Sequence, residues 1–208
     1  MPHALFSRQG WIFDLDGTLT VPVHDFDALR ALLQIPADED ILAHIDAAAP
    51  ARQRQLRSAV HQWEGALADR AVAQDDAWAL LSALQAQGAR LGVLTRNTRE
   101  TAHRTLQAAG LAGFFDPVDV VGREDAAAKP APDGVLLLLR RWGLTAEDGV
   151  MVGDYLYDSQ AGRAAGAATV LVLRGGDQGW DPAADVVLTD LRWLLADAAA
   201  TEAAAQPF

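Results

Sequence analysis

The fold of this 208-residue chain is decided by the stretch Trp11-Ile12-Phe13-Asp14-Leu15-Asp16-Gly17-Thr18-Leu19-Thr20. Its apolar first residues predict a short buried strand, and Gly17 breaks that pattern. Residues two apart on a strand point to the same face, so Asp14 and Asp16 would share one small site if the chain stayed extended. If the chain turns at Asp16, one side chain and one backbone carbonyl would be presented together instead. In either case two crowded acids favour a cation, and Mg²⁺, which takes oxygen ligands, is the natural candidate.

A single lysine, Lys129, stands among 17 lysines and arginines in total. Lysine carries a compact charge on a flexible stem, which suits contact with a phosphoryl oxygen and a carboxylate together. Pro132 and Asp133 are typical of a first helical turn, so Lys129 is expected just outside a helix N-terminus. The alternative is a general preference for arginine that left one lysine by accident. The position of Lys129 before a helix favours the functional interpretation.

A second apolar strand, Leu91 to Leu94, ends in the hydroxyl group of Thr95. Asn97, with Glu100 three residues later, resembles a capping box in which Asn replaces the usual Ser or Thr. Thr95 would then lie beside the free backbone N–H groups of a helix start, which form an anion site. The sequence leaves open whether Asn97 is a plain N-cap or contacts a substrate.

A third apolar strand, from Gly149 to Gly153, ends in Asp154, and Asp158 follows four residues later. Asp154 is placed to complete a metal site with Asp14. Asp158 would cap a helix that starts near Ser159, or hold Lys129 in position, and both can be true.

Taken in order, these segments form four motifs: Asp14-x-Asp16-Gly17-Thr18, Thr95, Lys129 and Gly153-Asp154-x-x-x-Asp158. The series resembles the haloacid dehalogenase-like (HAD) superfamily of phosphohydrolases over roughly residues 10 to 190. Within it, the chain is similar to the phosphoglycolate phosphatase and β-phosphoglucomutase branch, which inserts a helical cap after the first motif. Two departures bear on the substrate pocket: Tyr155 replaces a common Ser or Thr, and Arg96 replaces a common small residue.

The resemblance implies an Mg²⁺-dependent phosphatase that hydrolyses a small phosphorylated metabolite through an aspartyl-phosphate intermediate. It implies that Asp14 is the nucleophile and Asp16 the general acid and base. The implied metal ligands are Asp14, the backbone carbonyl of Asp16, and Asp154. The implied phosphate or substrate contacts are Thr95, Arg96, Asn97 and Lys129, and the supporting residues are Gly17, Gly153 and Asp158.

Two other functions fit the same motifs. A phosphomutase would return the phosphoryl group to a sugar, and a non-catalytic phosphate-binding protein would use the same fold. The catalytic interpretation is favoured because Asp14, Asp16 and Lys129 are all present. Family members that cleave carbon–halogen bonds lack the second acid, and those that cleave phosphonates use a cap lysine, which this chain does not have.

Alternating strands and helices predict an α/β fold with a doubly wound parallel sheet, a HAD-like Rossmannoid core. A small α-helical cap, residues 21–74, is expected after the first strand, with the catalytic core formed by residues 1–20 and 75–208. Strands are expected near 11–15, 90–95, 118–122, 149–153, 168–173 and 185–188. Core helices are expected near 75–87, 98–109, 132–142, 159–165 and 192–199, and the alanine-rich residues 198–205 read as a fraying helix end.

Three amphipathic helices are expected in the cap. Their apolar positions are Phe26, Leu29, Leu32 and Leu33 in the first, and Leu56, Val60, Trp63 and Leu67 in the third, with a second helix over 38–48 between them. Arg54, Arg57 and His61 share the opposite face of the third helix. That face is either solvated, which amphipathic helices favour, or in contact with an anionic substrate.

A formal net charge of −11 argues against nucleic acid and anionic membranes as partners, because both need a basic surface. The chain has no cysteine, so neither disulfides nor thiol catalysis is expected. No secretory signal and no apolar run of about 20 residues is visible, so a cytoplasmic location is expected. The specific substrate and the oligomeric state are not determined by the sequence.

Overall fold

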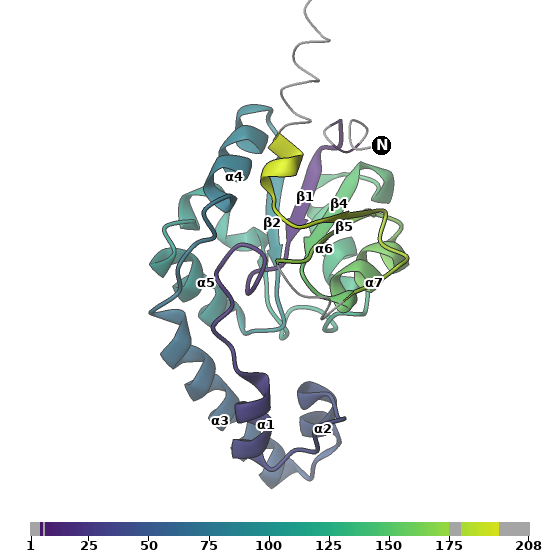
Figure 1. Cartoon of the computed structure of the whole chain (residues 1–208). Coiled ribbons are helices and arrows are strands. Elements are labelled where there is room, and N and C mark those ends of the chain that lie inside the picture. Colours follow the sequence, from purple (N-terminus) through teal and green to yellow (C-terminus); the bar gives the residue numbers. More distant parts are fainter. Residues whose placement is uncertain (1–4, 6, 175–179, 196–208) are drawn as a thin grey trace, which may run out of the picture.

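A six-stranded parallel sheet forms the centre of the computed structural model, which describes residues 5, 7–174 and 180–195. The spatial order of the strands is β3-β2-β1-β4-β5-β6, so the chain winds outward in both directions from β1 (Figure 1). The strands are β1 (Gly10–Phe13), β2 (Arg90–Leu94), β3 (Val120–Val121), β4 (Gly149–Gly153), β5 (Ala168–Val172) and β6 (Val186–Leu188). The predicted doubly wound α/β fold is confirmed.

Helices cover both faces of the sheet. They are α4 (Ala77–Ala86), α5 (Arg99–Ala108), α6 (Asp133–Trp142) and α7 (Leu156–Ala165), with short 3₁₀ turns η2 (Ala112–Phe114), η3 (Pro117–Asp119) and η4 (Ala146–Asp148). Successive residues of β1 point to opposite faces. Trp11 and Phe13 therefore pack in the cluster that includes Leu80 of α4, whereas Ile12 packs in the cluster that includes Leu138 of α6. Because β1 is buried on both faces, its residues are all apolar or glycine.

Three helices are inserted between β1 and α4, as predicted. They are α1 (Phe26–Leu33), α2 (Ile41–Ala47) and α3 (Pro50–Ala68), and they form the α1–α3 segment below the sheet in Figure 1. The segment has its own apolar cluster, whose buried members are Leu29, Leu33, Ile35, Ile45, Leu56 and Val60. The long helix α3 returns to the core and packs against α5. At this contact Nη2 of Arg104 on α5 donates to the Gly65 carbonyl of α3 at 3.1 Å.

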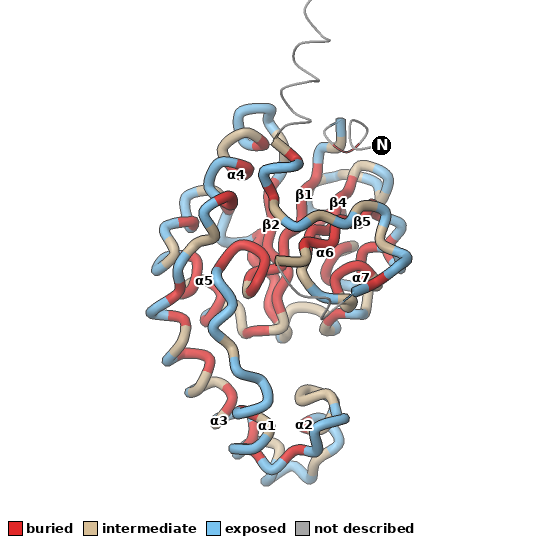
Figure 2. Tube along the Cα trace, in the orientation of Figure 1, coloured by how far each residue is buried: buried red, intermediate tan, exposed pale blue. Residues whose placement is uncertain are grey.

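The predicted apolar face of α1 is wrong in part. Leu29 and Leu33 are buried, but Phe26 and Leu32 are 51% and 65% exposed. The apolar cluster of the α1–α3 segment is small, and of α1 it buries only Leu29 and Leu33. Much of the rest of this helix is exposed (Figure 2).

Several predicted helix starts are shifted by local caps. The second inserted helix begins at Ile41 rather than residue 38, because Oδ1 of Asp40 accepts a hydrogen bond from the Ala43 N–H and so caps it. The last core helix before β5 begins at Leu156 rather than near Ser159. Residues 192–195 are helical, and the remainder of the helix predicted over 192–199, with the tail 198–205, lies outside the described residues.

Within the described ranges, every helix is too short or too polar to cross a membrane.

Candidate active site

The predicted motifs converge at the carboxyl edge of the sheet. Asp14 follows β1 directly, and its N–H donates to the Val152 carbonyl of β4 at 2.8 Å. Thr95 follows β2 and Asp154 follows β4. Parallel strands present their carboxyl ends at one edge, where open α/β sheets bind ligands.

Lys129 lies between two carboxylates. Its Nζ donates to Oδ1 of Asp14 at 2.5 Å and to Oδ1 of Asp158 at 2.6 Å. All three residues are buried. Burial alone would lower the pKa of Lys129, but the charges of Asp14 and Asp158 outweigh it and raise that pKa above its ordinary value. The ammonium group is therefore charged whenever both carboxylates are ionised.

Asp158 has two partners. Its Oδ1 accepts from Lys129, and its Oδ2 accepts from the backbone N–H of Tyr155 at 3.1 Å, at the start of α7. The structure thus shows both contacts that the sequence suggested, except that Asp158 lies inside the first turn of α7 and not before it. Gly153 allows this packing, because an added Cβ would lie 2.2 Å from the Asp158 side chain.

Asp14, Asp154 and Asp158 form an acidic cluster. Each offers one carboxylate oxygen, and the three oxygens lie within 4.8 Å of one another. Burial and the neighbouring charges of Asp14 and Asp158 raise the pKa of Asp154 to about 8, and burial also raises the pKa of Asp14. Three carboxylates face one ammonium group, so a divalent cation fits the excess of negative charge, and oxygen ligands suit Mg²⁺.

The turn after β1 brings Asp154 close to Asp14. The hydroxyl group of Thr18 donates to Oδ1 of Asp154 at 3.0 Å. Gly17 has a φ of +92°, and an added Cβ would lie 2.3 Å from Oδ2 of Asp154. Only glycine fits this conformation and this contact. Asp154 therefore packs directly against the turn, with Oδ1 held by Thr18.

Asp16 is not a member of the acidic cluster, although its charge acts on Asp14. Its Oδ2 accepts from Nδ2 of Asn97 at 2.7 Å, and Nδ1 of His24 lies 3.6 Å from its Oδ1. Burial and the nearby charge of Glu64 raise the pKa of Asp16 to about 7. An acid with such a pKa can give and take a proton at neutral pH.

Asn97 is not the N-cap of α5, which was one of the two roles that the sequence left open for it. Thr98 caps α5, because its hydroxyl oxygen accepts from the Thr101 N–H at 3.1 Å. The amide of Asn97 is free to hold Asp16 instead. Thr95 is buried, and its hydroxyl oxygen accepts from the Asn97 N–H at 3.1 Å.

Arg96 connects the core to the α1–α3 segment. Its Nη2 donates to both carboxylate oxygens of Asp40, at 2.8 Å and 2.6 Å. The guanidinium group also lies 5.1 Å above the ring of Tyr157. The residue that departs from the family pattern therefore contacts the start of α2.

A second ion pair, which was not predicted from the sequence, joins the same parts of the molecule. Nη1 and Nη2 of Arg123 donate to the Glu64 carboxylate on α3 at 2.6 Å and 3.0 Å, and Nη1 also donates to the Arg96 carbonyl at 3.0 Å. Both side chains are buried. A sequence signal existed, because Glu64 interrupts the apolar stripe of α3, four residues after Val60.

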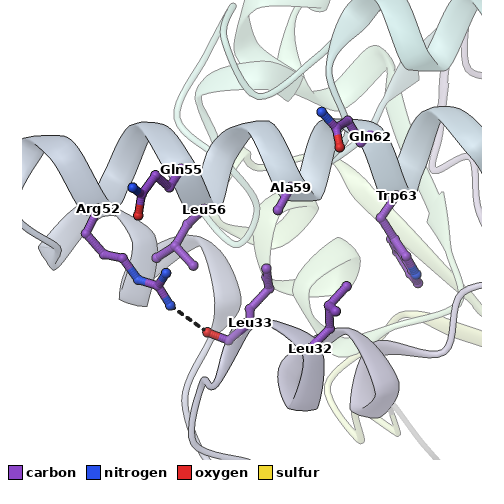
Figure 3. Close-up of a pocket in the computed structure, with 8 residues that line it drawn as sticks. All are labelled: Leu32, Leu33, Arg52, Gln55, Leu56, Ala59, Gln62 and Trp63. Atoms are coloured by element: carbon purple, nitrogen blue, oxygen red, sulfur yellow. Dashed lines mark hydrogen bonds between the residues drawn. The ribbon is translucent and has the colours of Figure 1, made fainter.

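Two of the three residues on the basic face of α3 lie away from the described site. Arg54 is exposed, and Arg57 pairs with Asp46 of α2 at 2.5 Å. His61 is half-buried and lies near the Glu64 carboxylate. A groove of about 570 Å³ lies between α1 and α3, where Leu32 and Leu33 face Leu56 and Trp63 (Figure 3). No residue from the carboxyl edge of the sheet lines this groove.

Comparison with known proteins identifies the family. The model of the haloacid dehalogenase-like hydrolases matches residues 10–166, so the chain belongs to this family of hydrolases. A haloacid dehalogenase-like hydrolase domain-containing protein of Arabidopsis thaliana is 32% identical over 188 residues, which cover 83% of this chain and 74% of that protein. A phosphoglycolate phosphatase of Rhodospirillum rubrum is 34% identical over 197 residues, which cover 79% of each chain.

A solved structure supports the same fold. A hydrolase of Pseudomonas syringae superposes with a TM-score of 0.75 at 24% identity, over 91% of this chain and 96% of that one.

Proposed function

We propose that this protein is an Mg²⁺-dependent phosphatase that hydrolyses a small phosphorylated metabolite through an aspartyl-phosphate intermediate. One observation carries the proposal: buried Asp14 contacts Lys129 and belongs to an acidic cluster, while the neighbouring Asp16, outside that cluster, has a pKa of about 7. Similarity to a phosphoglycolate phosphatase supports the same class of substrate.

The first chemical step is a transfer of the phosphoryl group to Asp14. A carboxylate oxygen of Asp14 forms a bond to phosphorus while the bond from phosphorus to the leaving oxygen breaks. Asp16 donates its proton to that oxygen, so the product leaves as an alcohol. Lys129, beside Asp14, stabilises the charge on the phosphoryl oxygens. The Thr95 hydroxyl is assigned to the same oxygens.

The second step hydrolyses the aspartyl-phosphate. Asp16, now ionised, takes a proton from water, and the water oxygen attacks phosphorus. The bond between phosphorus and Asp14 breaks, which releases phosphate and restores the Asp14 carboxylate. Asn97 keeps Asp16 in place for both steps.

The residues that would hold Mg²⁺ are Asp14, Asp154 and the backbone carbonyl of Asp16. Both oxygens of Asp158 already have protein partners, so it is the weaker candidate. When bound, Mg²⁺ supplies positive charge that offsets the repulsion between a phosphate dianion and the acidic cluster.

The α1–α3 segment is assigned the role of a cap, with residues 21–74 as its bounds. Arg96 and Arg123 pair with Asp40 and Glu64 of this segment, so the segment closes over the carboxyl edge of the sheet. Closure excludes water from the site. Arg96 and Asn97, on the loop after β2, are assigned contacts with the substrate. A cytoplasmic location stays a prediction from the sequence.

The experiment is phosphate release from a panel of phosphorylated metabolites, with Mg²⁺ and with EDTA, for the wild type and Asp14→Asn. Metal-dependent release that is absent in Asp14→Asn supports the proposal. Isomerisation of a sugar phosphate without phosphate release would indicate a phosphomutase. Binding of phosphate esters with neither reaction would indicate a non-catalytic protein.

A further inference from the structure

We propose that His24 is a positioning residue for Asp16 and that it makes proton transfer depend on the packing of the cap. The inference rests on the proposed phosphatase function, within which His24 has no assigned role. Its chain position is the connection between the Gly17 turn and α1, and no sequence motif marks it.

The environment of His24 is unusual for a structural histidine. Its side chain is only 7% exposed, and its Nδ1 is buried without a hydrogen-bond partner among the described residues. A buried polar atom without a partner opposes folding, so a role at the site accounts for its presence there. Oδ1 of Asp16 lies 3.6 Å from Nδ1. Burial lowers the pKa of His24, and the charge of the nearby Glu64 on α3 opposes that shift.

The two oxygens of Asp16 have different surroundings. Oδ2 accepts a hydrogen bond from Nδ2 of Asn97. Because the amide already places an N–H between the two atoms, there is no room for a proton of Asp16 on Oδ2. The proton that Asp16 transfers must therefore sit on Oδ1, the oxygen that faces His24. An imidazole N–H at Nδ1 can donate to Oδ1 once Asp16 is ionised and hold the carboxylate in one orientation.

The imidazole is itself held by the cap. Its ring stacks on Phe26 of α1, with centroids 5.5 Å apart and planes at 11°. It also lies 5.2 Å from the ring of Trp63 on α3, at 58°. The position of Nδ1 relative to Asp16 thus depends on α1 and α3 being packed in the closed arrangement. A cap that opens would carry His24 away from the acid.

The test separates proton donation from all other effects of a substitution. An alkyl phosphate needs a proton on its leaving oxygen, whereas p-nitrophenyl phosphate releases a stable phenolate without one. We would measure the burst of alcohol or phenolate release, which reports transfer to Asp14, with Mg²⁺ for the wild type, His24→Leu and His24→Asn. The Asn amide restores a donor near the position of Nδ1.

We expect His24→Leu to lower the burst rate with the alkyl phosphate about tenfold, and the burst rate with p-nitrophenyl phosphate less than about twofold. Tenfold is a part of the 10²–10⁴-fold that a positioned general acid contributes. His24→Asn should recover most of the alkyl rate. The ratio of the two rates is compared within each variant, so a loss of folded enzyme cancels. His44→Leu is the matched control, because His44 pairs with Glu39 on the surface of the cap.

Equal losses for both esters, or none, would overturn the role of His24. A wild type that releases product from neither ester with Mg²⁺ would overturn the proposed phosphatase itself, and the role of His24 with it.

Discussion

At the scale of single residues, the proposed mechanism depends on the contact between Asp14 and Lys129. Asp14→Asn keeps the size of the side chain but removes its charge and nucleophilicity. We expect turnover to fall by several orders of magnitude, as it does on the order of 10⁶-fold for other lost nucleophiles, while the fold persists. Phosphate release measures the loss of turnover, and thermal unfolding measures whether the fold persists. Asp27→Asn, at an exposed position, is the control. Near-normal turnover would contradict the nucleophile assignment.

Lys129 cannot be replaced by another cation. Lys129→Ala leaves Asp14 and Asp158 buried without their shared partner, so we expect weaker phosphate binding, slower turnover and a loss of about 3–5 kcal/mol in unfolding free energy. Lys129→Arg should not restore the rate, because a planar guanidinium does not fit between two oxygens 2.5 Å and 2.6 Å from Nζ. Single-turnover kinetics measure the rates of both variants, and urea unfolding measures their free energies of unfolding. Unchanged single-turnover rates in Lys129→Ala would remove it from the site.

At the scale of elements, the Arg123–Glu64 pair fastens α3 to the loop after β3. Arg123→Met leaves the Glu64 carboxylate buried and unpaired, so we expect a loss of about 3–5 kcal/mol in unfolding free energy. The double variant Arg123→Met, Glu64→Leu should recover most of that loss, because no buried charge remains. Urea unfolding of the two single variants and the double variant gives the coupling energy. Additive losses would show that the two side chains do not stabilise each other.

Elements with strong periodicity were predictable from the sequence, and their contacts were not. The buried strand before Asp14 and the helix after Pro132 follow from local apolar patterns and helix-start residues. The role of Asn97 was missed because Thr98, the next residue, is an equally good cap. The contacts of His24 and Glu64 were not predicted because their partners lie in other elements. No local sequence pattern indicates that His24 lies close to Asp16 across a turn.

At the scale of the whole molecule, the buried acids oppose folding as the pH rises. The folded protein raises the pKa of Asp16 from 3.8 to about 7 and that of Asp154 to about 8, so it holds protons that the unfolded chain has released. Stability from these groups is therefore highest in acid and is lost as the pH rises through this window. The raised pKa of Lys129 has no influence there, since lysine is protonated in both states.

We expect the Tm of the metal-free protein to be lower at about pH 8.5 than at about pH 5.5 for this reason. Mg²⁺ should raise the Tm more at the higher pH, because it binds ionised carboxylates. Calorimetry in EDTA and in Mg²⁺ at both pH values is the measurement, with Ca²⁺ as a comparison ion. A Tm in EDTA that rises with pH would contradict this assignment.

The single lysine has a practical consequence. Apart from the chain's α-amino group, Lys129 is the only primary amine, and it is 4% exposed and paired with two acids. Acylating reagents that modify surface lysines in most proteins would find none on this surface. The rate of their attachment to Lys129, measured by mass spectrometry, would report how often the buried Lys129 becomes accessible to reagents. If the proposed function is correct, a bound substrate should slow that attachment.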